Sequence, residues 1–167
     1  FENKDNPTAL DFFNSSKILL NQHDPFLKRY VHSLVLNNKI PQAISVVKSY
    51  KNKNSTDFFD AHLLIILDSL KKNNYKKATL NLKQLANFTG SNRLNLAIYE
   101  SLKEYVYVFK EKKIFKDKKN LGKLSTISET FQRCYLGEDA TDTSFSNLIS
   151  DEEADYTRYI YFYLSYL

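Results

Sequence analysis

The stretch that decides the fold is Thr56–Phe88, which reads TDFFDAHLLIILDSLKKNNYKKATLNLKQLANF. Its first half holds a dense apolar block, residues 63–67, followed by Leu70. The block is too long for a typical strand and too short to cross a bilayer, which takes about 20 apolar residues, so it predicts a core helix. After the polar residues 71–74, closely spaced apolar residues return at Tyr75, Ala78, Leu80, Leu82 and Leu85. They predict an amphipathic helix, and the short break predicts an antiparallel helical hairpin.

Helical patterns also cover most of the remaining chain, and no segment alternates convincingly as a strand does. The expected helices are residues 8–22, 25–36, 41–50, 93–109 and 126–136, with a short helical turn at 145–149 and a final helix running from about 150 to 167. Together with the central hairpin, they predict an all-α chain of about eight helices.

Several residues between these helices are typical start and stop signals. Gly90 is expected to adopt the left-handed conformation that closes a helix, and Ser91 or Asn92 to cap the next one. Thr126–Glu129 and Ser150–Glu153 each have the pattern of a capping box that opens a helix.

The composition is that of an ordinary globular protein, with 167 residues, 43% hydrophobic and 26% charged. The chain contains no Met, begins at Phe1 and stops in the middle of an apolar pattern at Leu167, so we expect a fragment of a longer protein. Asn, Lys, Ile, Phe and Tyr are abundant, whereas Gly and Pro occur three times each, as expected of an AT-rich genome. We therefore expect Asn, Ser or Lys at positions where a repeat family places Gly, Ala or Pro.

An internal repeat is indicated by three alanines. Ala43 follows Ala9 by 34 residues, and Ala78 follows Ala43 by 35. A small residue is needed where the two helices of a hairpin cross closely. The segments Asn74-Tyr75-Lys76-Lys77-Ala78 and Lys39-Ile40-Pro41-Gln42-Ala43 share a turn, a large apolar residue and the alanine. This period and pattern resemble the tetratricopeptide repeat (TPR), particularly the divergent repeats of long bacterial TPR proteins.

The resemblance, which covers roughly residues 6–102, implies an all-α fold in which antiparallel hairpins stack as a right-handed TPR-like α-solenoid. Residues 1–110 would form TPR-like repeats, the first of them truncated, and residues 111–167 degenerate helical repeats that continue the solenoid. Such solenoids hold a partner protein or peptide in a concave groove lined by the first helix of each repeat.

Residues that contact this partner are carried over from the family pattern. Lys28, His32 and Lys103 would select polar groups, and Leu67 and Tyr99 would anchor apolar ones, with Leu63 also facing the groove. The alternative is that Leu63, Leu67 and Tyr99 are simply packed beneath another helix of this fragment or of its missing continuation. The resemblance thus predicts a non-enzymatic scaffold or adaptor.

Nothing in the sequence forms a catalytic or metal-binding constellation. His23, His32 and His62 lack metal-ligand spacing, Cys134 has no histidine near it in sequence, and there is no Gly-rich phosphate loop. We therefore predict no enzyme activity, no cofactor and no metal. The single cysteine leaves the redox compartment open. We expect a soluble protein of the bacterial cytoplasm or periplasm, without a transmembrane segment in this stretch.

The net charge of +5 supports an alternative function. The lysine-rich run Lys110–Lys119 could bind nucleic acid or an anionic surface, but a run of this kind is more often a solvated linker or helix face, and lysines spread over many helices disfavour nucleic acid. A third possibility is self-assembly through the exposed ends of the repeats. The oligomeric state is left open.

Overall fold

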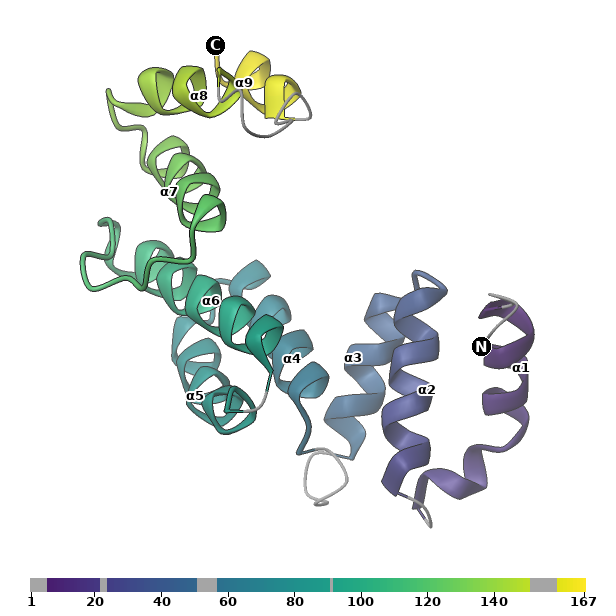
Figure 1. Cartoon of the computed structure of the whole chain (residues 1–167). Coiled ribbons are helices and arrows are strands. Elements are labelled where there is room, and N and C mark those ends of the chain that lie inside the picture. Colours follow the sequence, from purple (N-terminus) through teal and green to yellow (C-terminus); the bar gives the residue numbers. More distant parts are fainter. Residues whose placement is uncertain (1–5, 22–23, 51–56, 91, 151–158) are drawn as a thin grey trace. The chain divides into compact units, whose positions relative to one another are not determined.

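The computed structural model describes residues 6–21, 24–50, 57–90, 92–150 and 159–167, and all regular structure in these residues is helical. The predicted all-α class is therefore confirmed for them. The chain divides into two compact units, residues 1–95 and 96–167, which we call the N-terminal and C-terminal units and describe separately (Figure 1). The helices are α1 (Asn6–Ser15), η1 (Lys17–Asn21), α2 (Asp24–Leu36), α3 (Ile40–Ser49), α4 (Phe59–Lys71), α5 (Tyr75–Leu85), η3 (Ala86–Phe88), α6 (Arg93–Glu111), α7 (Lys123–Leu136), α8 (Thr141–Ile149) and α9 (Ile160–Tyr166).

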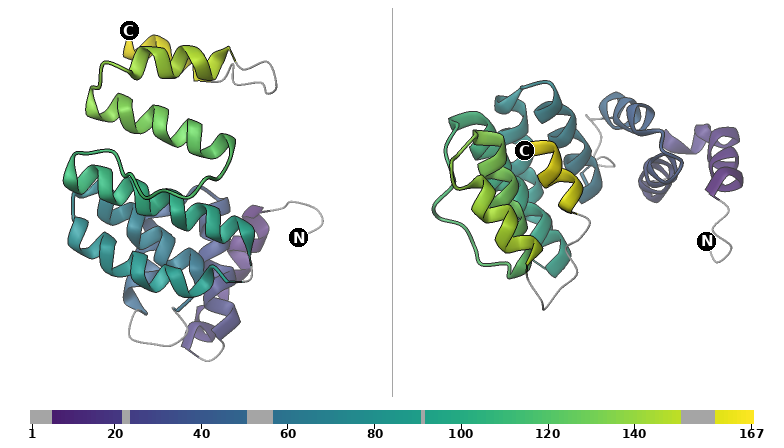
Figure 2. Two further views of the ribbon diagram at one scale, coloured as in Figure 1. Left: turned by 60° about the vertical axis from the view of Figure 1, so that its left-hand side comes forward. Right: turned by 90° about the horizontal axis from the view of Figure 1, so that it is seen from above.

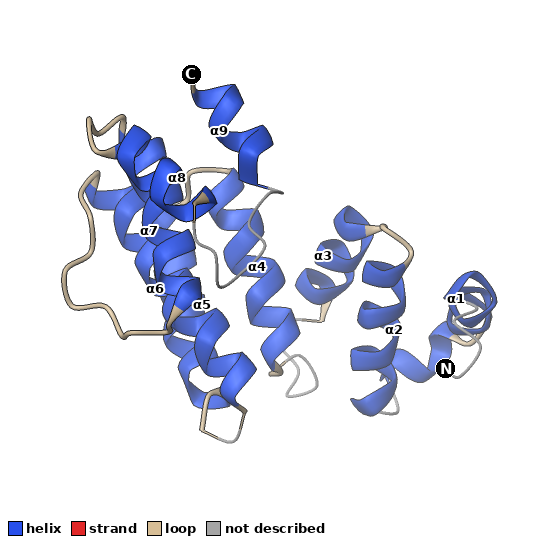
Figure 3. Ribbon diagram, turned by 45° about the horizontal axis from the view of Figure 1, so that its top comes forward, coloured by secondary structure: helices blue, strands red, loops and turns tan. Residues whose placement is uncertain are grey.

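Two antiparallel hairpins, α2 with α3 and α4 with α5, dominate the N-terminal unit (Figure 3). Ala43 on α3 and Ala78 on α5 both have no exposed surface. They face α2 and α4, whose Leu27 and Ile66 are likewise fully buried. The prediction that these alanines allow each pair of helices to approach closely fits this burial.

The two hairpins turn in the same way. In the first, Asn38 has a φ of 57°, and the next amide, that of Lys39, donates to the Leu34 carbonyl at 2.8 Å. In the second, Asn73 has a φ of 54°, and the Asn74 amide donates to the Ser69 carbonyl at 2.8 Å. A left-handed residue followed by this hydrogen bond is the Schellman motif, which usually uses glycine. Here asparagine occupies the position that glycine usually holds, and its replacement of a repeat family's glycine stays a prediction.

An ion-pair cluster connects the two hairpins of the N-terminal unit. Lys48 Nζ on α3 lies 2.6 Å from Asp68 Oδ2 on α4, and Lys72 Nζ lies 2.7 Å from Asp68 Oδ1. Hydrogen bonds from Lys48 and then Lys72 hold the pKa of Asp68 below its usual value of 3.8, against a smaller opposing effect of burial. The cluster thus contributes to stability only while Asp68 is ionised.

The C-terminal unit consists of most of α6, then α7, α8 and α9 (Figure 2). Gly137, with a φ of 66°, ends α7. Aromatic rings join the last three helices: the Phe131 ring of α7 lies 5.6 Å from that of Phe145 on α8 and 5.1 Å from that of Phe162 on α9. Tyr163 stacks on Phe145 at 5.4 Å. Such ring pairs contribute about 0.5–1.5 kcal/mol each beyond their buried area.

Some predicted helix boundaries were wrong. The first helix ends at Ser15 and is followed by the separate 3₁₀ segment η1, whereas one helix over 8–22 was expected. Gly90 does not have a positive φ, because η3 carries the chain out of α5 instead. The expected Asn92 cap is confirmed, since its Oδ1 accepts from the Leu94 amide at 2.8 Å.

The proposed capping box Thr126–Glu129 was also wrong. The helix starts three residues earlier, after Gly122, whose φ of 63° makes the turn, and the Ser125 hydroxyl accepts the Leu121 amide at 2.8 Å. Thr126 lies inside α7, where its carbonyl accepts the Thr130 hydroxyl. The predicted box Ser150–Glu153 falls largely outside the described residues.

Replacing Ala78 with leucine should destabilise the protein by about 2–3 kcal/mol, because the added atoms have no space between α4 and α5. Urea unfolding followed by circular dichroism would measure this loss. Ala140→Leu, at an exposed alanine, is the matched control and should change stability by less than about 0.5 kcal/mol. Equal stability of Ala78→Leu and the wild type would show that the hairpin is loosely packed.

Asp68→Asn should lower stability at pH 7 by about 0.5–1 kcal/mol, the range for ion pairs at a protein surface. Because the pKa of Asp68 is lowered by folding, its contribution is complete above about pH 5 and is lost as the pH falls below 3.8. The stabilities of variant and wild type should therefore converge in acid. In a Lys48→Gln, Lys72→Gln background the same substitution should have little effect at any pH, as thermal unfolding would test.

Candidate partner-binding site

The predicted contact residues Lys28 and His32 lie one turn apart on α2, and both are exposed. With Pro25, Arg29 and Asp60 they line a depression of about 350 Å³. Asp60 lies in the first turn of α4, so the depression lies between the first helices of the two hairpins. Sequence reasoning missed Arg29 and Asp60, although the run of two basic residues at 28 and 29 was a signal.

Leu63 and Leu67 lie one turn apart on α4. Leu67 is 48% exposed and Leu63 is half-buried, whereas the three residues between them, Leu64, Ile65 and Ile66, are buried. The apolar block therefore has two sides, one in the core and one reaching solvent at Leu67. Whether Leu67 contacts a partner or packs beneath a helix outside this stretch stays a prediction.

Tyr99 and Lys103 lie on α6 in the C-terminal unit, and both are half-buried. Lys103 already has contacts within this unit. Its Nζ is 3.3 Å from Glu100 Oε2 and lies over the Phe115 ring, 5.2 Å from the centroid. A groove formed jointly by α2, α4 and α6 stays a prediction, because the two units are described separately.

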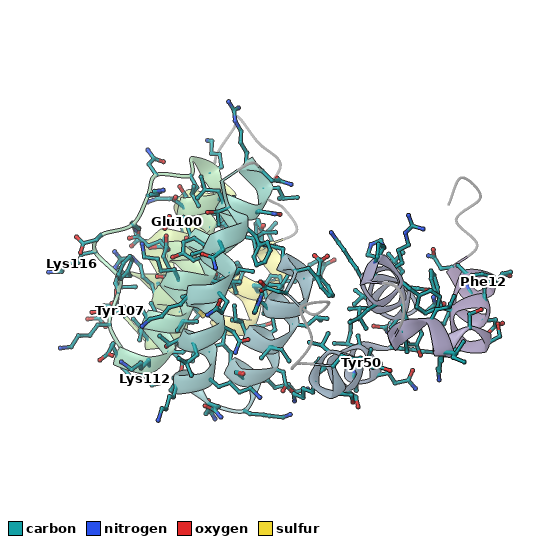
Figure 4. All side chains as sticks on the ribbon, turned by 90° about the horizontal axis from the view of Figure 1, so that it is seen from below. Phe12, Tyr50, Glu100, Tyr107, Lys112 and Lys116 are labelled. Atoms are coloured by element: carbon teal, nitrogen blue, oxygen red, sulfur yellow. The ribbon has the colours of Figure 1, made fainter. Side chains whose placement is uncertain are left out.

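The lysine-rich loop 112–122 folds back on α6. The Phe115 ring lies 5.0 Å from that of Tyr107, and Lys119 Nζ lies 3.2 Å from Glu100 Oε1 (Figure 4). Glu100 is 4% exposed. One of its carboxylate oxygens forms an ion pair with Lys103 and the other with Lys119. Part of the positive charge in this loop is therefore used to neutralise a buried carboxylate.

A second acidic residue, Glu129 on α7, forms further ion pairs with basic side chains of this unit. It pairs with Lys118, and its Oε1 lies 2.6 Å from the Arg133 guanidinium, which also contacts Glu138 at 2.6 Å. The hydrogen bond from Lys118 is the main reason that the pKa of Glu129 lies below its usual value; partial burial opposes it and Arg133 adds to it. Within the described residues, Lys113 and Lys116 form no ion pair, and Figure 4 shows Lys116 at the outer edge of the loop.

A buried polar seam joins α6 and α7. Gln132 Nε2 donates to Glu104 Oε2 at 2.9 Å and to Ser128 Oγ at 3.0 Å, and Glu104 and Gln132 are 2% and 1% exposed. Burial raises the pKa of the neighbouring Tyr105, although a hydrogen bond with Ser128 acts in the opposite direction. Sequence reasoning missed this seam because Glu and Gln on a helix usually lie at the surface.

Of the other histidines, His23 lies outside the described residues and His62 has structural contacts. His62 Nε2 is 2.8 Å from Asp57 Oδ1, and its ring lies 5.8 Å from that of Phe88. Cys134 is half-buried. Throughout the described ranges, no group of three or more His, Cys, Asp or Glu side chains is arranged to hold a metal ion. In the same ranges, no helix has both the length and the apolar character needed to cross a membrane.

Comparison of the chain with models of protein families, with curated proteins and with solved structures finds no match. The TPR resemblance therefore depends on the residues and turns described above.

Gln132→Leu should destabilise the protein by about 2–3 kcal/mol, because it leaves the buried Glu104 carboxyl without its amide donor. Replacing both residues, in Glu104→Leu with Gln132→Leu, should recover most of this loss, since the buried carboxylate is then absent and the Ser128 hydroxyl, which loses the amide donor, keeps its hydrogen bond with Tyr105. Stabilities of the two single variants and the double variant, measured by urea unfolding, form a double-mutant cycle. Additive losses would show that the two side chains do not depend on each other.

Proposed function

We propose that this chain is a non-enzymatic, TPR-like helical-repeat scaffold that holds a partner protein or peptide against the first helices of its hairpins. The observation that carries the proposal is the repeated turn. Asn38 and Asn73, 35 residues apart, have the same left-handed conformation and the same following hydrogen bond. Each is followed five residues later by a fully buried alanine, Ala43 or Ala78.

This repetition supports a repeat protein because the local geometry recurs together with the sequence period. A single helical hairpin cannot bury its outer faces, so repeats of this kind gain stability by stacking on one another. The ion pair between Lys48 and Asp68 is a contact of the sort that stacking requires. The right-handed solenoid is the arrangement that we expect to result.

Binding at the first helices is supported by what they leave accessible. The depression beside Lys28 and His32 is bordered by charged groups, and Leu67 presents a large apolar side chain on α4, the first helix of the next hairpin. Apolar anchors next to polar selecting groups are typical of protein interfaces. The combination suits a peptide that carries both kinds of side chain.

The alternative of a nucleic-acid or anionic-surface binder loses support from the ion pairs of the lysine-rich loop. Lys118 and Lys119 are engaged with Glu129 and Glu100, and Lys103 is engaged with Glu100 as well. Phosphate binding at this loop would have to compete with these carboxylates. We therefore keep partner binding at the first helices as the proposed function.

Leu67→Glu and Lys28→Glu should each weaken capture of the partner at least about tenfold, because each removes one kind of contact from the binding surface. The measurement is affinity capture from a lysate of the source organism with the immobilised protein, followed by quantitative mass spectrometry and then titration of the purified partner. Leu80→Glu and Lys83→Glu, at exposed residues of the second helix α5, are the matched controls and should bind normally.

All four variants must first show the helical content and unfolding midpoint of the wild type. The proposal fails if no protein is enriched over a column without bait. It also fails if the variants on α5 lose the partner to the same extent as those on α2 and α4, since binding would then lie elsewhere on the surface.

A further inference from the structure

An apolar pocket lies at the start of the N-terminal unit, next to the depression of the proposed partner-binding surface, with which it shares Arg29. It has a volume of about 510 Å³, within the usual size of small-ligand sites. The walls come from α1, η1 and α2, and the lining residues are Thr8, Ala9, Phe12, Phe13, Leu19, Phe26 and Arg29. Only two of these seven carry a polar side chain, and only Arg29 carries a charge.

An aromatic cluster holds the walls of the pocket in place. The Phe13 ring lies edge-on to that of Phe26 at 5.2 Å and lies 6.2 Å from that of Tyr30. Tyr30 in turn donates its hydroxyl hydrogen bond to Asn14 Oδ1 at 2.9 Å, which fixes α1 against α2. Both phenylalanines are buried, at 7% exposure each. Because these packed rings are already ordered, binding of a ligand would cost little conformational entropy at this side of the pocket.

The open side of the pocket exposes apolar surface. Phe12 is 63% exposed, and it lies on α1 at the surface of the molecule (Figure 4). Ile18, in the neighbouring η1, is 72% exposed. A large aromatic ring that remains in water at the mouth of an apolar pocket can still bury further area against a ligand, at about 25 cal/mol per Å².

Arg29 gives the pocket its charge selectivity. Among the described residues its guanidinium forms no ion pair and no hydrogen bond to a carboxylate. The same side chain borders the depression lined by Lys28, His32 and Asp60, so at this edge of the pocket the two cations Lys28 and Arg29 outnumber the single carboxylate. An anionic group held next to the apolar walls would complement this excess of positive charge, and a guanidinium binds a planar carboxylate through two parallel hydrogen bonds.

We propose that this pocket binds a small amphipathic carboxylate, an aromatic or aliphatic acid whose apolar part contacts Phe12, Phe13 and Phe26 while its carboxylate pairs with Arg29. A small molecule is favoured over a peptide because the walls offer too few polar groups for a peptide backbone, which would lose its hydrogen bonds to water on entry. The inference does not depend on the proposed partner binding, because the small molecule would bind to this chain alone.

The test uses naphthoate as the probe and naphthylmethanol as its uncharged match, with binding to the full chain measured by ligand-observed NMR titration. Naphthoate should bind at one site, about three- to fivefold more tightly than naphthylmethanol, as expected for one solvent-accessible ion pair. Arg29→Gln should remove this preference and leave the affinity for naphthylmethanol unchanged. Phe12→Ala should weaken both ligands, and it should fold because that ring is mostly exposed.

Two variants outside the pocket are the matched controls. Arg93→Gln removes another exposed arginine, and Phe162→Ala removes another exposed ring, at 55% exposure. Both should bind naphthoate as the wild type does. The proposal is overturned if naphthoate does not bind at millimolar concentration, if naphthylmethanol binds equally well, or if the control variants weaken binding as much as the pocket variants.

A peptide probe tests whether the carboxylate belongs to a small molecule or to a peptide. N-acetyl-phenylalanyl-glutamate amide presents an aromatic ring and a carboxylate on a peptide backbone. Binding of this peptide more tightly than naphthoate, with the same dependence on Arg29 and Phe12, would overturn the small-molecule assignment and make the pocket part of a peptide site. Weaker binding of the peptide than of naphthoate is the result that we expect.

Discussion

The packing of the N-terminal unit depends on the close approach of the two helices in each hairpin, which only three residues connect. At Ala43 and Ala78 the side chain is no larger than a methyl group, and neither residue has any exposed surface. This contact lets the helices of each hairpin share one apolar interior that includes Leu27 and Ile66. The left-handed Asn38 and Asn73 are needed for the same reason, since they reverse the chain within the short distance that the contact allows.

The C-terminal unit satisfies a different constraint. Between α6 and α7 the contact includes the polar residues Glu104, Ser128 and Gln132, and the connection is the long loop 112–122. Polar interiors are stable only when each group has a partner, and here Gln132 supplies donors to both of the others. The two units thus achieve helix packing by different means, one through small apolar contacts and the other through a connected hydrogen-bond network.

The sequence was informative where local chemistry decides the structure. Apolar periodicity placed α2, α3, α4 and α5, and the composition led to the expectation of Asn, Ser or Lys where a repeat family has Gly, Ala or Pro, which the left-handed Asn38 and Asn73 fit. The sequence was uninformative where contacts between residues far apart in the chain decide the structure. The lysine run was interpreted as a binding surface or a solvated linker because the buried Glu100, which Lys119 reaches, lies 19 residues earlier in the chain.

The candidate sites show the same division. Lys28, His32 and Leu67 were predicted because the TPR pattern assigns these first-helix positions to the groove, and the structure places Lys28 and His32 at one depression and leaves Leu67 exposed. The pocket beside Arg29 was missed because it exists only where the first helix breaks at Ser15 and η1 turns Leu19 towards α2. No start or stop signal marks that break, so a single continuous helix was the natural prediction.

The use of loop lysines as counter-charges has a consequence for covalent modification of the chain. Lys119 is 58% exposed and so is open to acylating reagents or enzymes, yet its ammonium group neutralises a carboxylate that is almost wholly out of water. Acetylation would abolish that charge and leave Glu100 with Lys103 alone, whereas methylation would keep it. A modification at the surface of this loop would therefore be felt inside the helical unit, as a change in how firmly the loop is held to α6.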